Sequence, residues 1–175
     1  MKINKAIICM KAIGLKPKIS VFGDRIKIQK AIFLLEQKGI VIGFNYGLYL
    51  RGPYSPELTQ EIYANQDAVE KLSTLEKLDK NEQEKINAYL EIFKDSDASI
   101  LEVAATYALF AYGYKFDSVS ATKKVKKMKN FYSEKQLAIG ISKAKQFLYI
   151  PTKKELGDMK KEHYAWQNAS TNFLE

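Results

Sequence analysis

The chain has 175 residues, of which 46% are hydrophobic and 27% are charged, and its formal net charge is +8. This length and composition are typical of one globular domain and exclude a disordered chain. No apolar run approaches the roughly 20 residues that cross a bilayer, so we expect no membrane partner. The single cysteine, Cys9, excludes an internal disulfide and a cysteine-rich metal site, which favours a cytoplasmic protein.

The charges are distributed unevenly. Residues 1–64 hold ten Lys or Arg against four acids, and residues 65–114 hold five against ten. Residues 115–161 then hold thirteen lysines against four acids. Such asymmetry favours a polyanion or an acidic protein as partner for the basic surface. A lysine-rich helix face that only keeps the protein dissolved is the equally good alternative.

The N-terminal part predicts two helices and a β element. Residues 3–13 are basic and then apolar, and they predict a first helix because no signal-peptide cleavage site follows. Asp24 can cap a second helix that runs to about residue 38. The β-branched, aromatic and glycine residues that follow predict a hairpin or a bent strand over about residues 41–51.

The middle of the chain predicts more helices. Residues 51–58 must form a turn, in which Ser55 can cap a helix that begins at Pro56. Leucines at helical spacing predict a helix over residues 66–78, and another follows around residues 86–93. Residues 98–112 are rich in alanine and nearly uncharged, so we expect this helix to be the most buried.

The lysine-rich segment at residues 115–161, the basic quarter of the chain, predicts two amphipathic helices. Asp117 or Ser118 can cap the first, whose inward side would carry Val119, Thr122, Val125 and Met128, with the solvent face formed by Lys123, Lys124, Lys126, Lys127 and Lys129. Ser133 and Gln136 form a capping-box pattern that begins the second helix, and Pro151 would end it. A last helix would begin at Thr152 and end near Trp166.

These elements predict a mostly α fold. We expect a single helical domain over residues 1–166 with a small winged-helix-like β element, followed by a flexible tail at residues 167–175.

The residue inventory gives little support to catalysis. His163 is the only histidine, so no multi-histidine metal site exists, and Cys9 lies between apolar neighbours. The glycines form no phosphate-binding loop pattern. We therefore expect a protein that is not an enzyme and has no cofactor or metal site.

Residues 118–148 can be interpreted as a DNA-binding helix–turn–helix. Lysines of the first helix would contact phosphates, and polar residues of the second would read base edges. The candidate residues are Lys123, Lys124, Lys127, Lys135, Gln136 and Lys143. The alternative is two ordinary helices of a bundle, which have the same sequence pattern.

A second cluster lies in the turn at residues 48–58. Tyr49, Arg51 and Tyr54 gather there, and aromatic residues beside an arginine are typical binding anchors. The alternative is that Gly52 and Pro53 only redirect the chain while the tyrosines pack against the second helix.

Two motifs resemble a known group of proteins. The helix sequence at residues 26–35 and the turn Gly-Pro-Tyr-Ser-Pro-Glu-Leu at residues 52–58 resemble the uncharacterised YwgA-type family, which is related in motif to the Panacea (SocA-like) antitoxin domains. The sequence departs from the antitoxin group at residues 31–32 and 50–51. The resemblance implies a helical domain with a small winged-helix-like element. For the antitoxin branch it also implies toxin neutralisation or an adaptor function through protein contacts.

The sequence therefore favours a non-enzymatic regulatory or antitoxin-like protein that binds a protein partner, which could be a toxin. Its expected binding surface consists of Gln29, Lys30, Tyr49, Arg51, Tyr54 and Ser55. A DNA-binding transcriptional regulator is the alternative, and a homodimer is left open.

Overall fold

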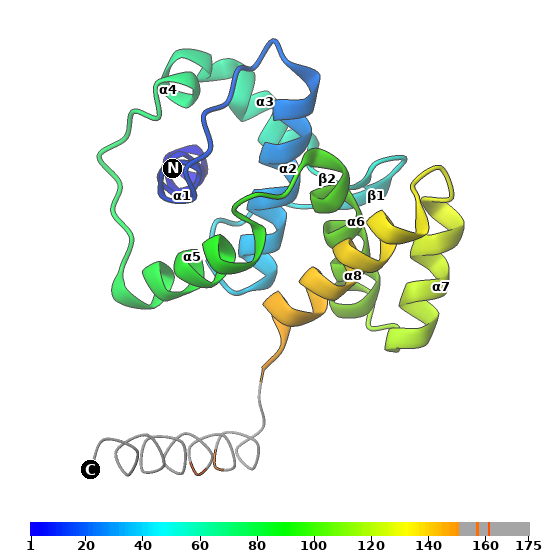
Figure 1. The fold of residues 1–175 in the computed structure, drawn as a ribbon. Helices are drawn as coiled ribbons and strands as arrows, with labels where there is room; N and C mark the ends of the chain where they lie inside the picture. The colour runs from blue at the N-terminus through cyan, green and yellow to red at the C-terminus, as the bar shows by residue number, and fades with distance from the viewer. Residues whose placement is uncertain (151–156, 158–160, 162–175) are drawn as a thin grey trace, which may run out of the picture.

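The computed structural model describes residues 1–150, 157 and 161. These residues form a mostly helical fold with one two-stranded antiparallel sheet, so the predicted fold class is confirmed (Figure 1). In the described part of the chain, no helix has both the length and the apolar character that crossing a membrane requires. The elements in chain order are α1 (Lys2–Ala12), α2 (Phe22–Gln37), β1 (Gly47–Tyr49), β2 (Gly52–Tyr54), α3 (Pro56–Ala64), α4 (Gln66–Glu70), α5 (Lys80–Phe93), α6 (Ala98–Ala108), the π-helical turn η1 (Leu109–Gly113), α7 (Ser118–Met128) and α8 (Glu134–Leu148).

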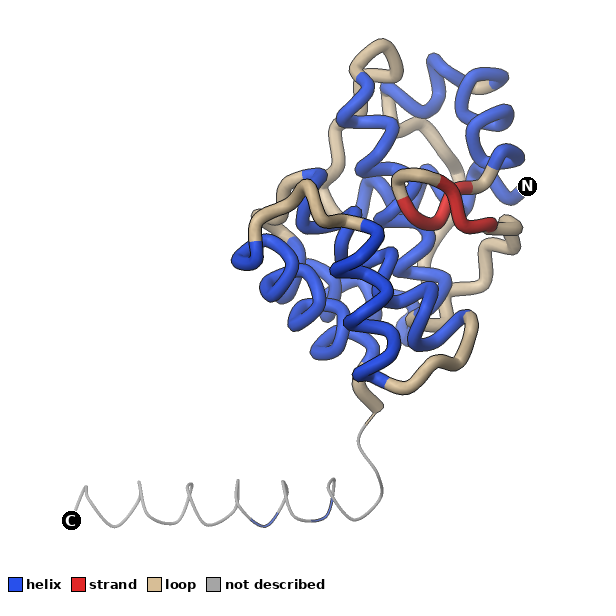
Figure 2. The backbone as a smooth tube through the Cα atoms, turned by 90° about the vertical axis from the view of Figure 1, so that its right-hand side faces the viewer, coloured by secondary structure: helices blue, strands red, loops and turns tan. Residues whose placement is uncertain are grey.

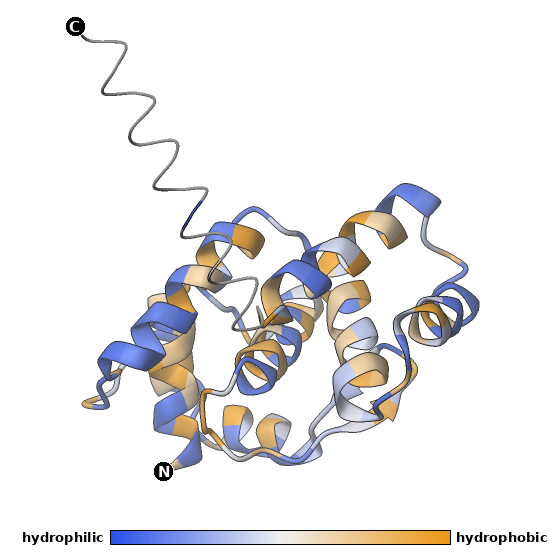
Figure 3. Ribbon diagram, turned by 90° about the horizontal axis from the view of Figure 1, so that it is seen from below, coloured by the Kyte–Doolittle hydropathy of each residue, from blue (hydrophilic) through white to orange (hydrophobic). Residues whose placement is uncertain are grey.

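Helix α6 lies at the centre and packs mainly against α8 and α2. Every residue from Ile100 to Ala108 is buried, which confirms the prediction that this alanine-rich helix is deeply buried. The close packing of α6 on α8 depends on Gly140, where an added Cβ would lie 2.6 Å from Cβ of Val103. Seen from below, several helices carry both hydrophobic and hydrophilic residues (Figure 3).

Local signals located several helix starts correctly. The Ser55 hydroxyl accepts a hydrogen bond from the backbone N–H of Leu58, as a cap of α3 should. Asp117 caps α7, and Ser133 forms the expected capping box with Gln136 at the start of α8. The predicted helix from Thr152 to Trp166, the domain limit at 166 and the tail at 167–175 lie outside the described residues.

Some sequence predictions were wrong. Helix α2 begins at Phe22, so Asp24 lies in its first turn instead of capping it. The helix predicted over residues 66–78 ends at Glu70, because Leu72 adopts a left-handed backbone conformation with φ of 50°. Val119 was placed inward but is 63% exposed, because α7 buries Ala121 and Val125 instead.

The hairpin lies later in the chain than the predicted range of 41–51. Its strands pair Gly47 with Tyr54 and Tyr49 with Gly52, so half of it falls in the segment predicted as a turn. Figure 2 shows these strands at the surface, against the helical body. At Gly52, φ is +84°, and an added Cβ would lie 2.2 Å from Oγ1 of Thr106 on α6. The hairpin therefore rests directly on the central helix.

Candidate binding pocket beside the hairpin

A cavity of about 500 Å³ lies between α2, the hairpin and α3. This volume is within the range of sites that hold small ligands or the anchoring side chains of a partner. Five of the six residues predicted to bind a partner line it: Gln29, Lys30, Tyr49, Arg51 and Tyr54. The other lining residues are Phe22, Arg25, Ile26, Leu50, Thr59, Ile62 and Tyr63.

The rim of the pocket is aromatic and well exposed. Phe22, Tyr49 and Tyr63 are each more than half exposed, and Leu50 is 82% exposed. The guanidinium carbon of Arg51 lies 5.3 Å from the ring centroid of Phe22, and that of Arg25 lies 5.5 Å from the same ring. Exposed apolar clusters of this kind mark interaction sites in proteins.

Lys30, which we predicted to belong to the contact surface, lines the pocket but has only 2% of its surface exposed. Its Nζ donates a hydrogen bond of 2.6 Å to the carbonyl oxygen of Pro53 in β2. Burial lowers the pKa of Lys30 to about 7, an effect that the Glu102 carboxylate opposes and that Lys129 and Arg51 increase. The pocket therefore has a buried amine that changes its charge near neutral pH.

Gln29 and Ser55 hold the hairpin to α2. Oε1 of Gln29 accepts a hydrogen bond of 2.9 Å from the backbone N–H of Ser55, and its Nε2 donates to the Ser55 carbonyl oxygen at 3.0 Å and to Oγ1 of Thr59 at 2.9 Å. We predicted that both residues belong to a contact surface, but Gln29 is 4% exposed and Ser55 is fully buried. Their polar groups are used in hydrogen bonds within the protein, so these residues hold the hairpin in place and do not contact a partner.

Glu102 is a site residue that the sequence analysis missed. Its Oε1 lies 2.6 Å from Nζ of Lys129, and its Oε2 lies 3.3 Å from Nη1 of Arg51. The same Lys129 amine donates a hydrogen bond of 2.9 Å to the carbonyl oxygen of Leu50 at the hairpin tip. Glu102 is the only charged residue in the segment 98–112. A single acid in an otherwise uncharged helix was the sequence signal that could have identified it.

Lys129 corrects a further prediction. It was assigned to the solvent-facing lysines of α7, but its side chain is fully buried. The helix ends at Met128, so Lys129 leaves the helical spacing and turns toward Glu102. Burial lowers its pKa, against the opposing effect of the Glu102 carboxylate.

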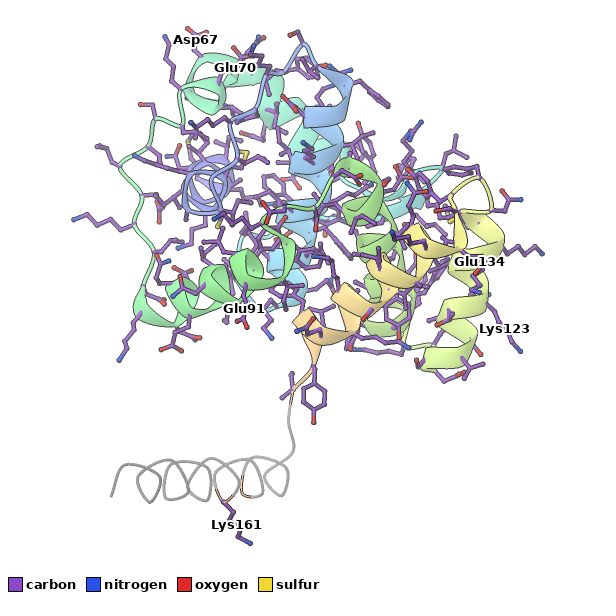
Figure 4. The ribbon with its side chains drawn as sticks, in the orientation of Figure 1. Asp67, Glu70, Glu91, Lys123, Glu134 and Lys161 are labelled. Atoms are coloured by element: carbon purple, nitrogen blue, oxygen red, sulfur yellow. The ribbon has the colours of Figure 1, made fainter. Side chains whose placement is uncertain are left out.

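The residues predicted to bind DNA divide into two groups. Lys123, Lys124, Lys127 and Lys135 are exposed, and Lys123 points away from the body of the molecule (Figure 4). Gln136 and Lys143 do not project freely, which contradicts their predicted place on an open helix face. Gln136 donates a hydrogen bond of 3.1 Å to Oγ of Ser99, and Lys143 donates to the carbonyl oxygen of Ile92.

Comparison with family models, curated proteins and solved structures gives no match for this chain. The resemblance to the YwgA-type and Panacea groups therefore stays a prediction. Within residues 1–150, 157 and 161, no three His, Cys, Asp or Glu side chains gather in a way that could hold a metal ion.

Proposed function

We propose that this protein is a non-catalytic binding module that recognises a segment of a partner protein at the pocket beside the hairpin. The observation that carries the proposal is the exposed rim of Phe22, Tyr49, Leu50 and Tyr63 around a cavity of about 500 Å³. Large aromatic residues with arginine at the edge of a pocket are the usual anchors of protein interfaces.

The rigid mounting of this rim supports the proposal. The hairpin is held to α2 by Gln29, to α6 by the close approach of Gly52, and at its tip by Lys129. A rim that is already ordered loses less conformational entropy when a partner binds. The buried polar groups under the hairpin therefore contribute to affinity by fixing the residues above them.

A regulatory or antitoxin-like protein is one kind of protein that would use such a binding module. Such a protein acts by occupying a surface of its partner, which requires an anchor site and no catalytic group. The motif at residues 52–58, on which the resemblance to antitoxin domains rests, includes Pro53, whose carbonyl oxygen contacts Lys30, and Ser55, which Gln29 holds. A toxin is one class of partner that fits this role.

DNA binding remains the second candidate, and the exposed lysines of α7 favour it. Lys123, Lys124 and Lys127 can neutralise phosphates without reading sequence. Gln136 and Lys143 are held by protein contacts, so the residues proposed to read bases are less suited to that role. We therefore give partner-protein binding precedence.

A displayed library of random peptides tests the proposal without a known partner. The library is selected on the wild-type protein, and the enriched peptides are then tested on the rim variant Leu50→Ser/Tyr63→Ala. Both side chains are largely exposed, so the variant should fold. We expect peptides that bind the wild type and lose binding to the variant. Failure to enrich any peptide that depends on the rim would contradict the proposed function.

A further inference from the structure

We propose that the partner segment seated in the pocket carries an aspartate or glutamate, next to a large apolar residue, whose carboxylate pairs with Lys30 and Arg51. This inference rests on the proposed function and specifies the chemistry of the partner.

The first observation is an excess of positive charge around one buried carboxylate, Glu102. Lys30 and Lys129 are almost fully excluded from solvent, and Arg51 contacts the same buried carboxylate, Glu102, as Lys129 does. When Lys30 is protonated, one carboxylate therefore faces three cations. Desolvated cations are stabilised by opposite charge, and the described residues provide no second acid at this place. An acidic group supplied by a partner would complete the balance.

The second observation is unused hydrogen-bonding capacity. A protonated lysine has three N–H donors, and among the described residues the Lys30 amine has one acceptor, the Pro53 carbonyl oxygen. Lys30 also lines the cavity. Arg51 makes one ion pair through Nη1, and its side chain is 48% exposed, so other N–H groups of its guanidinium can reach a ligand. Because both residues line the pocket, we infer that one carboxylate can pair with both.

The third observation is the apolar wall around these cations. Ile26, Ile62, Tyr54 and the four residues of the rim form most of the lining. A phosphate chain is strongly hydrated and would lose its water against such a wall without replacement. A peptide can place a large apolar side chain on the wall and a neighbouring carboxylate on Lys30. The lining therefore favours an acidic peptide over a nucleic acid.

The charge of the whole chain is complementary to such a partner. The formal net charge is +8, and exposed lysines cluster on α7. A basic surface accelerates the approach of acidic partners and has little effect on neutral ones.

The proposal gives a specific dependence on pH. The charged groups that face Lys30 are Glu102 on α6, Arg51 on the hairpin and Lys129 after α7. A carboxylate pairs with the protonated amine only. Because the pKa of Lys30 lies near 7 in the free protein, the affinity for an acidic peptide should fall as the pH rises above 7.

The experiment uses the rim-dependent peptides from the displayed library. We expect Asp or Glu next to a large apolar residue to be enriched over the unselected library. The peptide of highest affinity is then synthesised in two forms, acidic and with the acid replaced by Asn or Gln. On the wild-type protein at pH 6, the amide form should bind about tenfold more weakly, as the loss of one charged hydrogen-bonded pair predicts.

The variants locate the effect. On Lys30→Met, where Arg51 alone can still pair with the carboxylate, the difference between the acidic and amide forms should fall clearly below tenfold, and on the control Lys27→Met the tenfold difference should remain. Lys27 is on the same helix but lines a different cavity. The pH series on the wild type, from 6 to 9, tests the same claim without substitution: the acidic form should weaken and the amide form should not.

Two results are distinguishable failures. Rim-dependent peptides without acid enrichment, or with equal affinity of the two forms on the wild type, would overturn the inference and leave the proposed function standing. The absence of any rim-dependent peptide would overturn both.

Discussion

The carboxylate of Glu102 and the ammonium group of Lys129 lie 2.6 Å apart, and both side chains are almost completely buried. Through this pair, the basic segment at residues 115–161 is connected to the hairpin, although the sequence presents the two as separate features. Lys129 belongs to the basic quarter, and through the Leu50 carbonyl oxygen it holds the tip of the hairpin. The lysine-rich segment thus contributes directly to the geometry of the pocket.

The first prediction concerns this buried pair. Replacing Glu102 with Gln leaves the Lys129 ammonium buried without a counter-charge, so the free energy of unfolding should fall by about 3–5 kcal/mol. Urea unfolding followed by circular dichroism measures it. The control is Lys126→Met, which breaks the exposed pair of Lys126 and Glu134 and should change stability by less than about 1 kcal/mol. If the two variants lower the free energy of unfolding by similar amounts, the buried pair of Glu102 and Lys129 does not stabilise the fold more than an exposed pair does.

The second prediction concerns the contact of the hairpin with α6. Gly52→Ala combines a positive φ with a Cβ only 2.2 Å from Oγ1 of Thr106. Gly14 has a similar φ of +73° but open space around it, so Gly14→Ala should show only the backbone penalty of about 1–2 kcal/mol. Gly52→Ala should lower the melting temperature clearly more than Gly14→Ala does. Equal shifts of the melting temperature would show that the Thr106 side chain can move aside and that the hairpin does not pack closely against α6.

The third prediction is a pH dependence of stability. Because the pKa of Lys30 is about 7 in the folded chain and about 10.4 when unfolded, the unfolded chain holds more protons at this residue between those values. Lys30 therefore makes the free energy of unfolding rise with pH from about 7 to 10. Burial raises the pKa of the Cys9 thiol to about 12, which acts in the opposite direction above about pH 8.5.

Comparison with Lys30→Met separates these two effects. The stability of the wild type minus that of the variant should increase across pH 7 to 10 in chemical denaturation experiments. A difference that stays constant over this range would show that Lys30 keeps an ordinary pKa in the fold.

The structure also explains which features the sequence could predict. Caps such as Ser55 and Ser133 depend on residues within one helical turn, so a local pattern identifies them. The inward turn of Lys129 depends on Glu102, which lies 27 residues away, and no local periodicity encodes it. Lys30 was expected on a binding surface, but it is buried, and its burial depends on the hairpin, which comes later in the chain and folds over α2.

The fourth prediction concerns DNA. Any binding of duplex DNA should come from phosphate contacts of Lys123, Lys124 and Lys127, so it should fall steeply with salt and show no sequence preference. Changing these three lysines to Gln should flatten the log–log salt slope by about 0.9 per lost contact. Fluorescence anisotropy on two unrelated duplexes measures both effects. A sequence preference that Gln136→Ala or Lys143→Ala alters would favour the DNA-binding regulator over the account given above.

The most direct measurement is the affinity of the best selected peptide for Arg51→Ala/Tyr54→Ala, determined by isothermal titration calorimetry. Both side chains line the pocket, and anchors of this type each contribute about 2 kcal/mol or more. We predict at least about a hundredfold loss of affinity, with the far-UV circular dichroism spectrum unchanged. The control Tyr114→Ala, which removes an exposed tyrosine that does not line the pocket, should bind as the wild type does. Wild-type affinity in the folded Arg51→Ala/Tyr54→Ala variant would contradict the claim that this pocket is the binding site.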